Sequence, residues 1–224
     1  MRAFRIACML SVLVASIASQ PKDKLAISGS VQKELQSFGL TDAKLMRLKA
    51  HGIDVERSLM EAHELDEKGK AVFSDLVIIG TVRQVVDMPG PDSKNNPFHS
   101  KITIDVDSVL KGKLPRNRMV EILRQSGPTT GAFRKVVSSD VRLTQGEHVL
   151  AFLQRPENNS FLRAYYRAYF ESLQSGANGD CYWLDPSFSF PIRGDKVTVN
   201  RKERQLDEVM KNVLLIDSIL STVE

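Results

Sequence analysis

Arginine and tyrosine side chains alternate in one segment of the chain, and this combination of residue types can bind anions. Every second residue belongs to the set, which comprises Arg163, Tyr165, Arg167 and Tyr169. On a β-strand, residues at this spacing share one face. Guanidinium groups pair with carboxylate, sulfate or phosphate groups, and tyrosine rings add rigid contact area. This Arg-Tyr ladder predicts a ligand-binding strand face, with stacking of arginines on tyrosines for packing alone as the alternative.

A second basic segment precedes the Arg-Tyr ladder. Between residues 111 and 142 the chain holds eight lysines and arginines but two carboxylates, a local charge of +6 in a chain whose net charge is +4. Arg134 and Lys135 lie at the centre of this segment. Together with the ladder, they predict a basic, aromatic-lined face for an extended polyanion or an acidic protein.

The one cysteine in the body of the chain is a candidate nucleophile. Cys181 stands beside Tyr182 and Trp183, and a thiol hydrolase built on it is an alternative function. In papain-like proteases the catalytic histidine follows the cysteine, whereas all four histidines here precede Cys181: His51, His63, His99 and His148. The residues therefore favour a small buried side chain at this position over a catalytic thiol.

Other catalytic and metal-binding patterns are incomplete. The G-x-S-x-G motif is missing, and the segment from His63 to Glu67 lacks the second histidine of H-E-x-x-H. That acidic segment, with Asp66, is expected to be the solvent-exposed face of a helix. Asp105 and Asp107 share one strand face and could bind Ca²⁺, but an exposed face opposite a basic neighbour is favoured. We therefore expect no catalytic residue, no metal site and no cofactor.

The first 18 residues are predicted to form a secretory signal peptide. Arg2 and Arg5 precede an apolar run over residues 6–18, which is shorter than the roughly 20 residues that span a bilayer. Small residues end the run, as signal peptidases require. Cleavage removes Cys8 and leaves Cys181 as the one thiol, so no intrachain disulfide can form. We expect an exported protein, periplasmic or secreted and of bacterial type, with no membrane span after cleavage and no nucleic-acid partner.

A helical prelude is expected over residues 19–72. The patterns predict one helix over 30–38, a second that starts at Thr41 or Asp42, and a third that starts at Asp54. The second helix carries an apolar stripe made of Leu45, Met46 and Leu48. The main domain then extends over residues 73–224.

From residue 73 the apolar pattern changes to that of strands. Strands are expected over residues 76–82, 102–107, 119–123, 148–153 and 161–170, with a hairpin over 188–199. Gly80 inside the first run predicts a bend or bulge. Asn200 and Glu203 have capping-box spacing and predict a final helix. Its apolar stripe is formed by Leu206, Val209, Met210, Val213 and Leu220.

Three of these segments resemble one known family. Residues 74–82 resemble the first strand of netrin-like domains, the OB-type barrels found in tissue inhibitors of metalloproteinases. Residues 106–112 resemble the family's strand end before Lys-Gly, and residues 143–150 resemble its LxxGxxYLL strand entry. Similar patterns occur in exported bacterial proteins. The resemblance covers about residues 73–155 and implies an OB-type fold.

The zinc-chelating Cys-x-Cys of the tissue inhibitors has no counterpart at the expected mature start, residues 19–22. The resemblance therefore implies the fold and not that mechanism of inhibition. We expect a mainly β, α+β fold: an OB-like Greek-key barrel of five to six strands, a helical N-terminal prelude and a C-terminal amphipathic helix.

The expected function is that of an exported, non-enzymatic binding or interaction module. Its ligand is an anionic polymer or a protein partner, recognised by the ladder with Arg134 and Lys135. A protease inhibitor that acts through barrel loops is the remaining alternative.

Overall fold

The computed structural model describes residues 29–55, 65–87, 100–113, 118–128, 134–136, 141–155, 180–182, 184 and 188–221. The expected signal peptide and the Arg-Tyr ladder lie outside these residues, as does most of the third expected helix.

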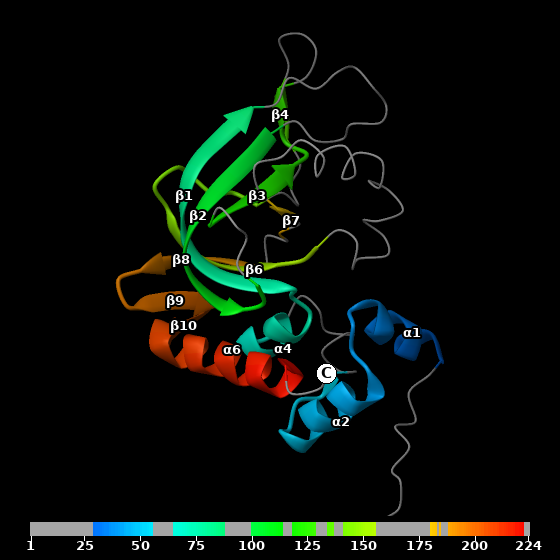
Figure 1. Cartoon of the computed structure of the whole chain (residues 1–224). Helices are drawn as coiled ribbons and strands as arrows, with labels where there is room; N and C mark the ends of the chain where they lie inside the picture. The colour runs from blue at the N-terminus through cyan, green and yellow to red at the C-terminus, as the bar shows by residue number, and fades with distance from the viewer. Residues whose placement is uncertain are drawn as a thin grey trace, which may run out of the picture.

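Two long strands, β1 (Leu76–Asp87) and β2 (Ser100–Lys111), form the middle of the sheet and curve through the molecule (Figure 1). The remaining strands of this sheet are β3 (Met119–Arg124), β6 (His148–Leu153), β7 (Asp180–Tyr182), β8 (Ser189–Arg193), β9 (Lys196–Val199) and β10 (Lys202–Gln205). A separate pair consists of β4 (Gly127–Pro128) and β5 (Arg134–Lys135). The helices are α1 (Gly29–Ser37), α2 (Asp42–Ala50), α4 (Glu67–Val72) and α6 (Leu206–Ser221).

The sheet has the strand order β10-β9-β8-β6-β1-β2-β3-β7. Six of the seven pairings between neighbouring strands of this sheet are antiparallel, and β7 joins β3 in parallel. The mainly β class is confirmed, but the described strands do not close into a barrel. Closure requires the two outer strands to pair. Here β8, β9 and β10 instead follow one another through short turns and extend the sheet outward beyond β6.

Strand β1 is irregular at Gly80, as expected from its glycine. The register with β2 shifts between Ile79 and Gly80 and again between Val82 and Gln84. A Cβ atom on Gly80 would lie 2.5 Å from the carbonyl oxygen of Asp105 and 2.7 Å from Cγ2 of Ile104. Strand β2 can approach this closely because Gly80 has no side chain.

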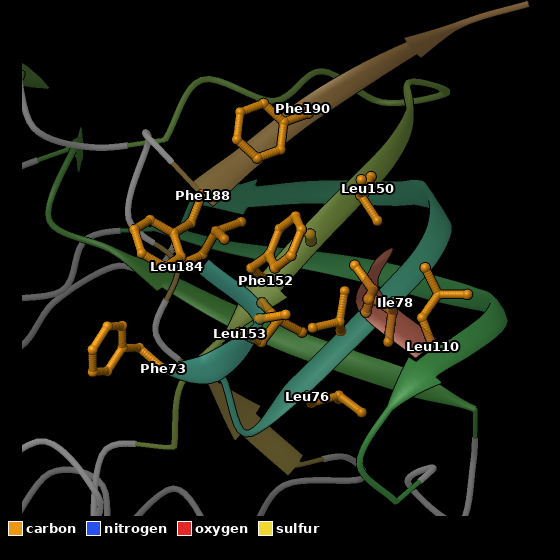
Figure 2. Packing of buried hydrophobic residues seen from close by; sticks show 14 of the residues in the cluster. Phe73, Leu76, Ile78, Leu110, Leu150, Phe152, Leu153, Leu184, Phe188 and Phe190 are labelled. Atoms are coloured by element: carbon orange, nitrogen blue, oxygen red, sulfur yellow. The ribbon is translucent and has the colours of Figure 1, made fainter. Parts of the chain in front are cut away.

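One hydrophobic cluster joins the helices to the sheet. Its aromatic part is centred on Phe152, whose ring lies edge-on to Phe188 and Phe190 at centroid distances of 6.4 and 5.8 Å (Figure 2). Strand β1 is buried on both faces over residues 76–80. The prelude contributes to the same cluster through Leu35 and Leu48, which are fully buried.

Helix α6 packs against α4 and β2 (Figure 1), through a buried face that shares Val209 and Val213 with the expected apolar stripe and adds Ile216 and Ile219. Val209, Val213, Ile216 and Ile219 are buried, three or four residues apart, as one face of a helix requires. Leu206, Met210 and Leu220 lie at the margin of the cluster. Across the described residues, no helix combines the length and the apolar character needed to cross a membrane.

The first two prelude helices form where expected. The side chain of Thr41 caps α2 by accepting a hydrogen bond from the backbone N–H of Lys44 at 3.4 Å. Leu45 and Leu48 are buried, but Met46 is 59% exposed, contrary to the expected stripe. Residues three apart share a helix face, whereas adjacent residues are rotated by about 100°. Met46 therefore cannot face the core together with Leu45 and Leu48.

Replacement of Gly80 by alanine tests the close approach of β1 and β2. The Gly80→Ala variant should lose about 2 kcal/mol of unfolding free energy, because the backbone of β2 must move away from the new methyl group. Urea unfolding measures the loss. Gln84→Ala, on an exposed position of the same strand, is the control and should change stability by less than about 0.5 kcal/mol. Equal stability of the two variants contradicts the prediction.

Candidate functional site

Of the expected ligand-binding residues, the structure describes Arg134 and Lys135. Arg163, Tyr165, Arg167 and Tyr169 lie outside the described residues. Arg134 and Lys135 form strand β5, which pairs with β4 outside the main sheet. The basic face predicted from these residues therefore stays a prediction.

The thiol alternative gains no support from the described histidines. Cys181 lies in β7 with its backbone opposite Glu121 of β3. The imidazole of His148 lies 3.4 Å from a carboxylate oxygen of Asp107, and Nδ1 of His51 lies 2.8 Å from the carbonyl oxygen of Arg47. His63 and His99 lie outside the described residues.

Asp105 and Asp107 belong to a polar band on the solvent face of β1, β2 and β6. Nη1 of Arg83 lies 3.5 Å from Asp105, and the hydroxyl of Thr81 donates to Asp107 at 3.3 Å. This is the exposed face with basic neighbours that the sequence favours. In the part of the chain that the structure describes, no three histidine, cysteine or acidic side chains group as metal ligands.

A polar hollow with a volume of 690 Å³ lies between α4 and the turn that joins β9 to β10. Its described lining consists of Asp66, Glu67, Val199, Asn200, Arg201, Lys202 and Arg204. Three cations and two carboxylates meet here, and Val199 is the one apolar residue among them. We call this site the hairpin hollow.

The turn at the edge of the hairpin hollow has an unusual backbone. Asn200 and Arg201 have φ angles of 50° and 62°, and they separate the paired residues Val199 and Lys202. Two left-handed residues match the right-handed twist of a two-residue hairpin, but arginine adopts this conformation rarely. The amide of Asn200 donates to the carbonyl oxygen of Leu65 at 2.6 Å. This bond fixes the turn against the start of α4.

The expected capping box at Asn200 and Glu203 is therefore wrong. Glu203 lies in β10 and pairs with Lys196 of β9 at 2.6 Å. Helix α6 begins at Leu206, whose backbone N–H donates to the carbonyl oxygen of Asp195 at 2.8 Å. The polar residues that resemble a helix start instead form a hairpin, because strand pairing with β9 satisfies their backbone groups.

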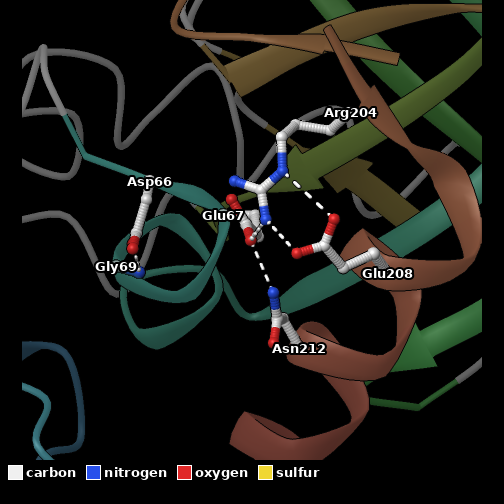
Figure 3. Close-up of polar contacts among 6 residues, drawn as sticks. All are labelled: Asp66, Glu67, Gly69, Arg204, Glu208 and Asn212. Atoms are coloured by element: carbon white, nitrogen blue, oxygen red, sulfur yellow. Dashed lines mark hydrogen bonds and ion pairs between the residues drawn. The ribbon is translucent and has the colours of Figure 1, made fainter. Parts of the chain in front are cut away.

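Glu67 lies at the buried side of the hairpin hollow, which corrects its expected place on an exposed helix face. It is 2% exposed, because α4 packs against α6. The side chain of Asp66 caps the start of α4 by accepting a hydrogen bond from the backbone N–H of Gly69 at 2.9 Å. Oε1 of Glu67 accepts hydrogen bonds from Arg204 at 3.2 Å and Asn212 at 2.6 Å (Figure 3). Oε2 has no hydrogen-bond partner among the described residues.

Arg204 is held between two carboxylates. Its Nε and Nη2 atoms donate to Glu208 at 3.4 and 2.7 Å, while Nη2 also reaches Glu67 (Figure 3). The hydrogen bond with Glu208, followed by the charge of Glu67, raises the pKa of Arg204 above its usual value. The same hydrogen bond lowers the pKa of Glu208. Arg204 thus neutralises the buried carboxylate and ties β10 to both helices.

Arg201 and Lys202 behave differently from Arg204. Both are exposed and line the hairpin hollow, and their side chains form no ion pair or hydrogen bond with any residue that the structure describes. Their charges are therefore open to a ligand. Arg201 and Lys202 were not among the expected site residues. The sequence signal for their turn is Asn200 directly after the alternating Val197-Thr198-Val199 run, a pattern typical of a strand followed by a two-residue turn.

No protein-family model, curated protein or solved structure matches the chain. The function must therefore be argued from the chemistry of the site, since a fold alone does not determine function.

The opposite end of α4 is anchored by a buried ammonium group. Nζ of Lys111 donates to the carbonyl oxygens of Ala71, at 2.6 Å, and Ser74. Burial lowers the pKa of Lys111 to about 8, although the nearby charges of Asp75 and Asp217 oppose this shift. Cations interact favourably with the carbonyl groups at the end of a helix. Lys111 thus holds in place the helix that carries Glu67.

Removal of the Glu67 carboxylate should destabilise the protein much more than removal of the Glu208 carboxylate. Glu67→Ala leaves Asn212 without its acceptor and should cost about 2–3 kcal/mol of unfolding free energy. Glu208→Ala removes an exposed partner of Arg204 and should cost less than about 1 kcal/mol. Chemical denaturation of both variants measures the difference. A larger loss for Glu208→Ala contradicts the structural role given to Glu67.

The stability of the protein should increase with pH in the alkaline range because of Lys111. Its pKa is about 8 in the folded state and 10.5 as the ordinary value, so between these pH values the unfolded chain binds more protons. This group therefore contributes a slope of up to about 1.4 kcal/mol per pH unit to the unfolding free energy. Lys111→Met should remove that slope, whereas Lys113→Met, at an exposed neighbour, should keep it. Denaturant unfolding curves from pH 7.5 to 10.5 give the unfolding free energy at each pH. Identical slopes of this free energy against pH for both variants contradict the role given to Lys111.

Proposed function

We propose that this protein is an exported, non-enzymatic binding module for an acidic ligand, either an anionic polymer or an acidic protein, and that the hairpin hollow is its binding site. The observation that carries the proposal is the pair of exposed cations, Arg201 and Lys202, which line the hollow and pair with no described residue. Exposed cations on a fixed backbone provide both long-range attraction and direct hydrogen bonds to an anion.

Preorganisation of the turn supports the proposal. Asn200 fixes the turn to the carbonyl oxygen of Leu65, so ligand binding loses little conformational entropy in this backbone. Arg201 adopts a left-handed conformation, and strained backbone of this kind is concentrated at functional sites. Because Val199 is the one apolar residue among the described lining residues, the site suits a polar ligand.

The leader peptide directs the choice among acidic ligands. Export to the periplasm or the medium, as proposed from residues 1–18, separates the protein from most nucleic acid. Acidic glycans, cell-wall polymers and acidic proteins are the polyanions of that environment. The Arg-Tyr ladder, with Arg134 and Lys135, is proposed as a second contact surface for a ligand long enough to extend beyond the hairpin hollow.

A relationship to OB-type, netrin-like domains belongs to the same proposal. The sequence patterns of residues 74–82, 106–112 and 143–150 support it. OB-type folds use a curved sheet and its loops to bind extended polymers, which agrees with a binding role.

Removal of the two free cations tests the proposed site. The Arg201→Gln/Lys202→Gln variant should bind a soluble polyanion, polygalacturonate, about tenfold more weakly at low salt, since two charge-assisted contacts are lost at about 0.7 kcal/mol each. Isothermal titration measures the affinity.

The matched control is Lys33→Gln/Lys49→Gln, which removes the same charge from exposed positions on α1 and α2 and should bind with unchanged affinity. An equal loss in both variants shows non-specific attraction and contradicts the proposed site. The Arg163→Ala/Arg167→Ala variant, assayed alongside, measures the share of binding due to the Arg-Tyr ladder. If the unmodified protein binds no polyanion and no acidic protein, the proposed function is wrong.

A further inference from the structure

One oxygen of Glu67 lacks a hydrogen bond in the described structure, although the other has two. Oε1 accepts from Arg204 and Asn212, whereas Oε2 is buried without a partner among the described residues. A buried carboxylate oxygen without a donor is costly, and native structures contain few such atoms. Glu67 lines the hairpin hollow, so a ligand in the hollow is placed to supply the missing donor.

The charges around the hollow decide which kind of donor fits. Arg201, Lys202 and Arg204 all line it, and Arg204 already neutralises Glu67 through an ion pair of 3.2 Å. These three cations outnumber the carboxylates of Asp66 and Glu67 in the lining, so an ammonium or guanidinium group on the ligand would be repelled. A hydroxyl group donates a hydrogen bond without adding charge.

Building on the proposed function, we infer that the hairpin hollow binds a hydroxylated anion of the acidic-sugar class, a uronate unit of a polysaccharide. The carboxylate of the sugar pairs with Arg201 and Lys202, and a ring hydroxyl donates to Oε2 of Glu67 after a small rotation of that carboxyl group. The volume of 690 Å³ falls within the range of about 300–1,000 Å³ typical of small-molecule sites.

Two probes of equal charge test this inference. Trigalacturonate carries three carboxylates and many hydroxyls, and propane-1,2,3-tricarboxylate carries three carboxylates and no hydrogen-bond donor. The unmodified protein should bind trigalacturonate at least fivefold more tightly. The Glu67→Gln variant places an amide NH₂, a donor, at the position of Oε2. Its affinity for trigalacturonate should therefore fall to that for the tricarboxylate, and its affinity for the tricarboxylate should not change.

The control carboxylate is Glu147, which accepts from the N–H of Thr144 at 2.9 Å and does not line the hairpin hollow. Glu147→Gln should keep the preference for trigalacturonate. Thermal unfolding verifies that the Glu67→Gln variant is folded. If this variant does not fold, the affinities of the unmodified protein for the two probes still test whether the hairpin hollow prefers a hydroxylated anion.

The possible failures are distinguishable. Equal affinity of the unmodified protein for both probes, with sensitivity to Arg201→Gln/Lys202→Gln, overturns the acidic-sugar inference and leaves the binding function intact. A preference that survives in a folded Glu67→Gln variant also overturns the inference, because the hydroxyl then has another acceptor. Absence of binding to both probes and to all other polyanions overturns the function itself.

Discussion

The ion pair between Glu67 and Arg204 connects the parts of the protein on which the proposed site depends. Glu67 belongs to α4, Arg204 to β10, and the additional partners Asn212 and Glu208 to α6. Removal of one member of a buried pair leaves an uncompensated charge, so such a pair strongly constrains its neighbours. Because Lys111 anchors the other end of α4, both ends of this short helix are fixed by charged side chains rather than by apolar packing alone.

The sheet could be predicted from the sequence where the pattern was local. The runs that became β1, β3 and β6 are apolar and β-branched, and the hairpin over residues 188–199 shows its turn at Gly194. Local patterns could not determine whether the sheet closes into a barrel. Whether β10 pairs with a distant strand or remains at an edge depends on contacts between residues far apart in the chain, which periodicity does not encode.

The candidate site was missed because its residues have ordinary local explanations. Glu67 lies in an acidic segment that is typical of an exposed helix face, but it is buried because α4 packs against α6. Asn200 and Glu203 have the spacing of a capping box, yet Asn200 lies in the turn between β9 and β10 and Glu203 pairs with Thr198 of β9. The sequence indicated a binding module with basic residues, but it pointed to the Arg-Tyr ladder and not to the two-residue turn.

The junction between β10 and α6 has a mechanical consequence. Strand β10 ends at Gln205 and α6 begins at the next residue, Leu206, so no linker absorbs movement between them. The position of the turn relative to the 16-residue helix is therefore fixed by the continuous chain and by the hydrogen bonds that join Arg204 to Glu208 and Glu67 to Asn212.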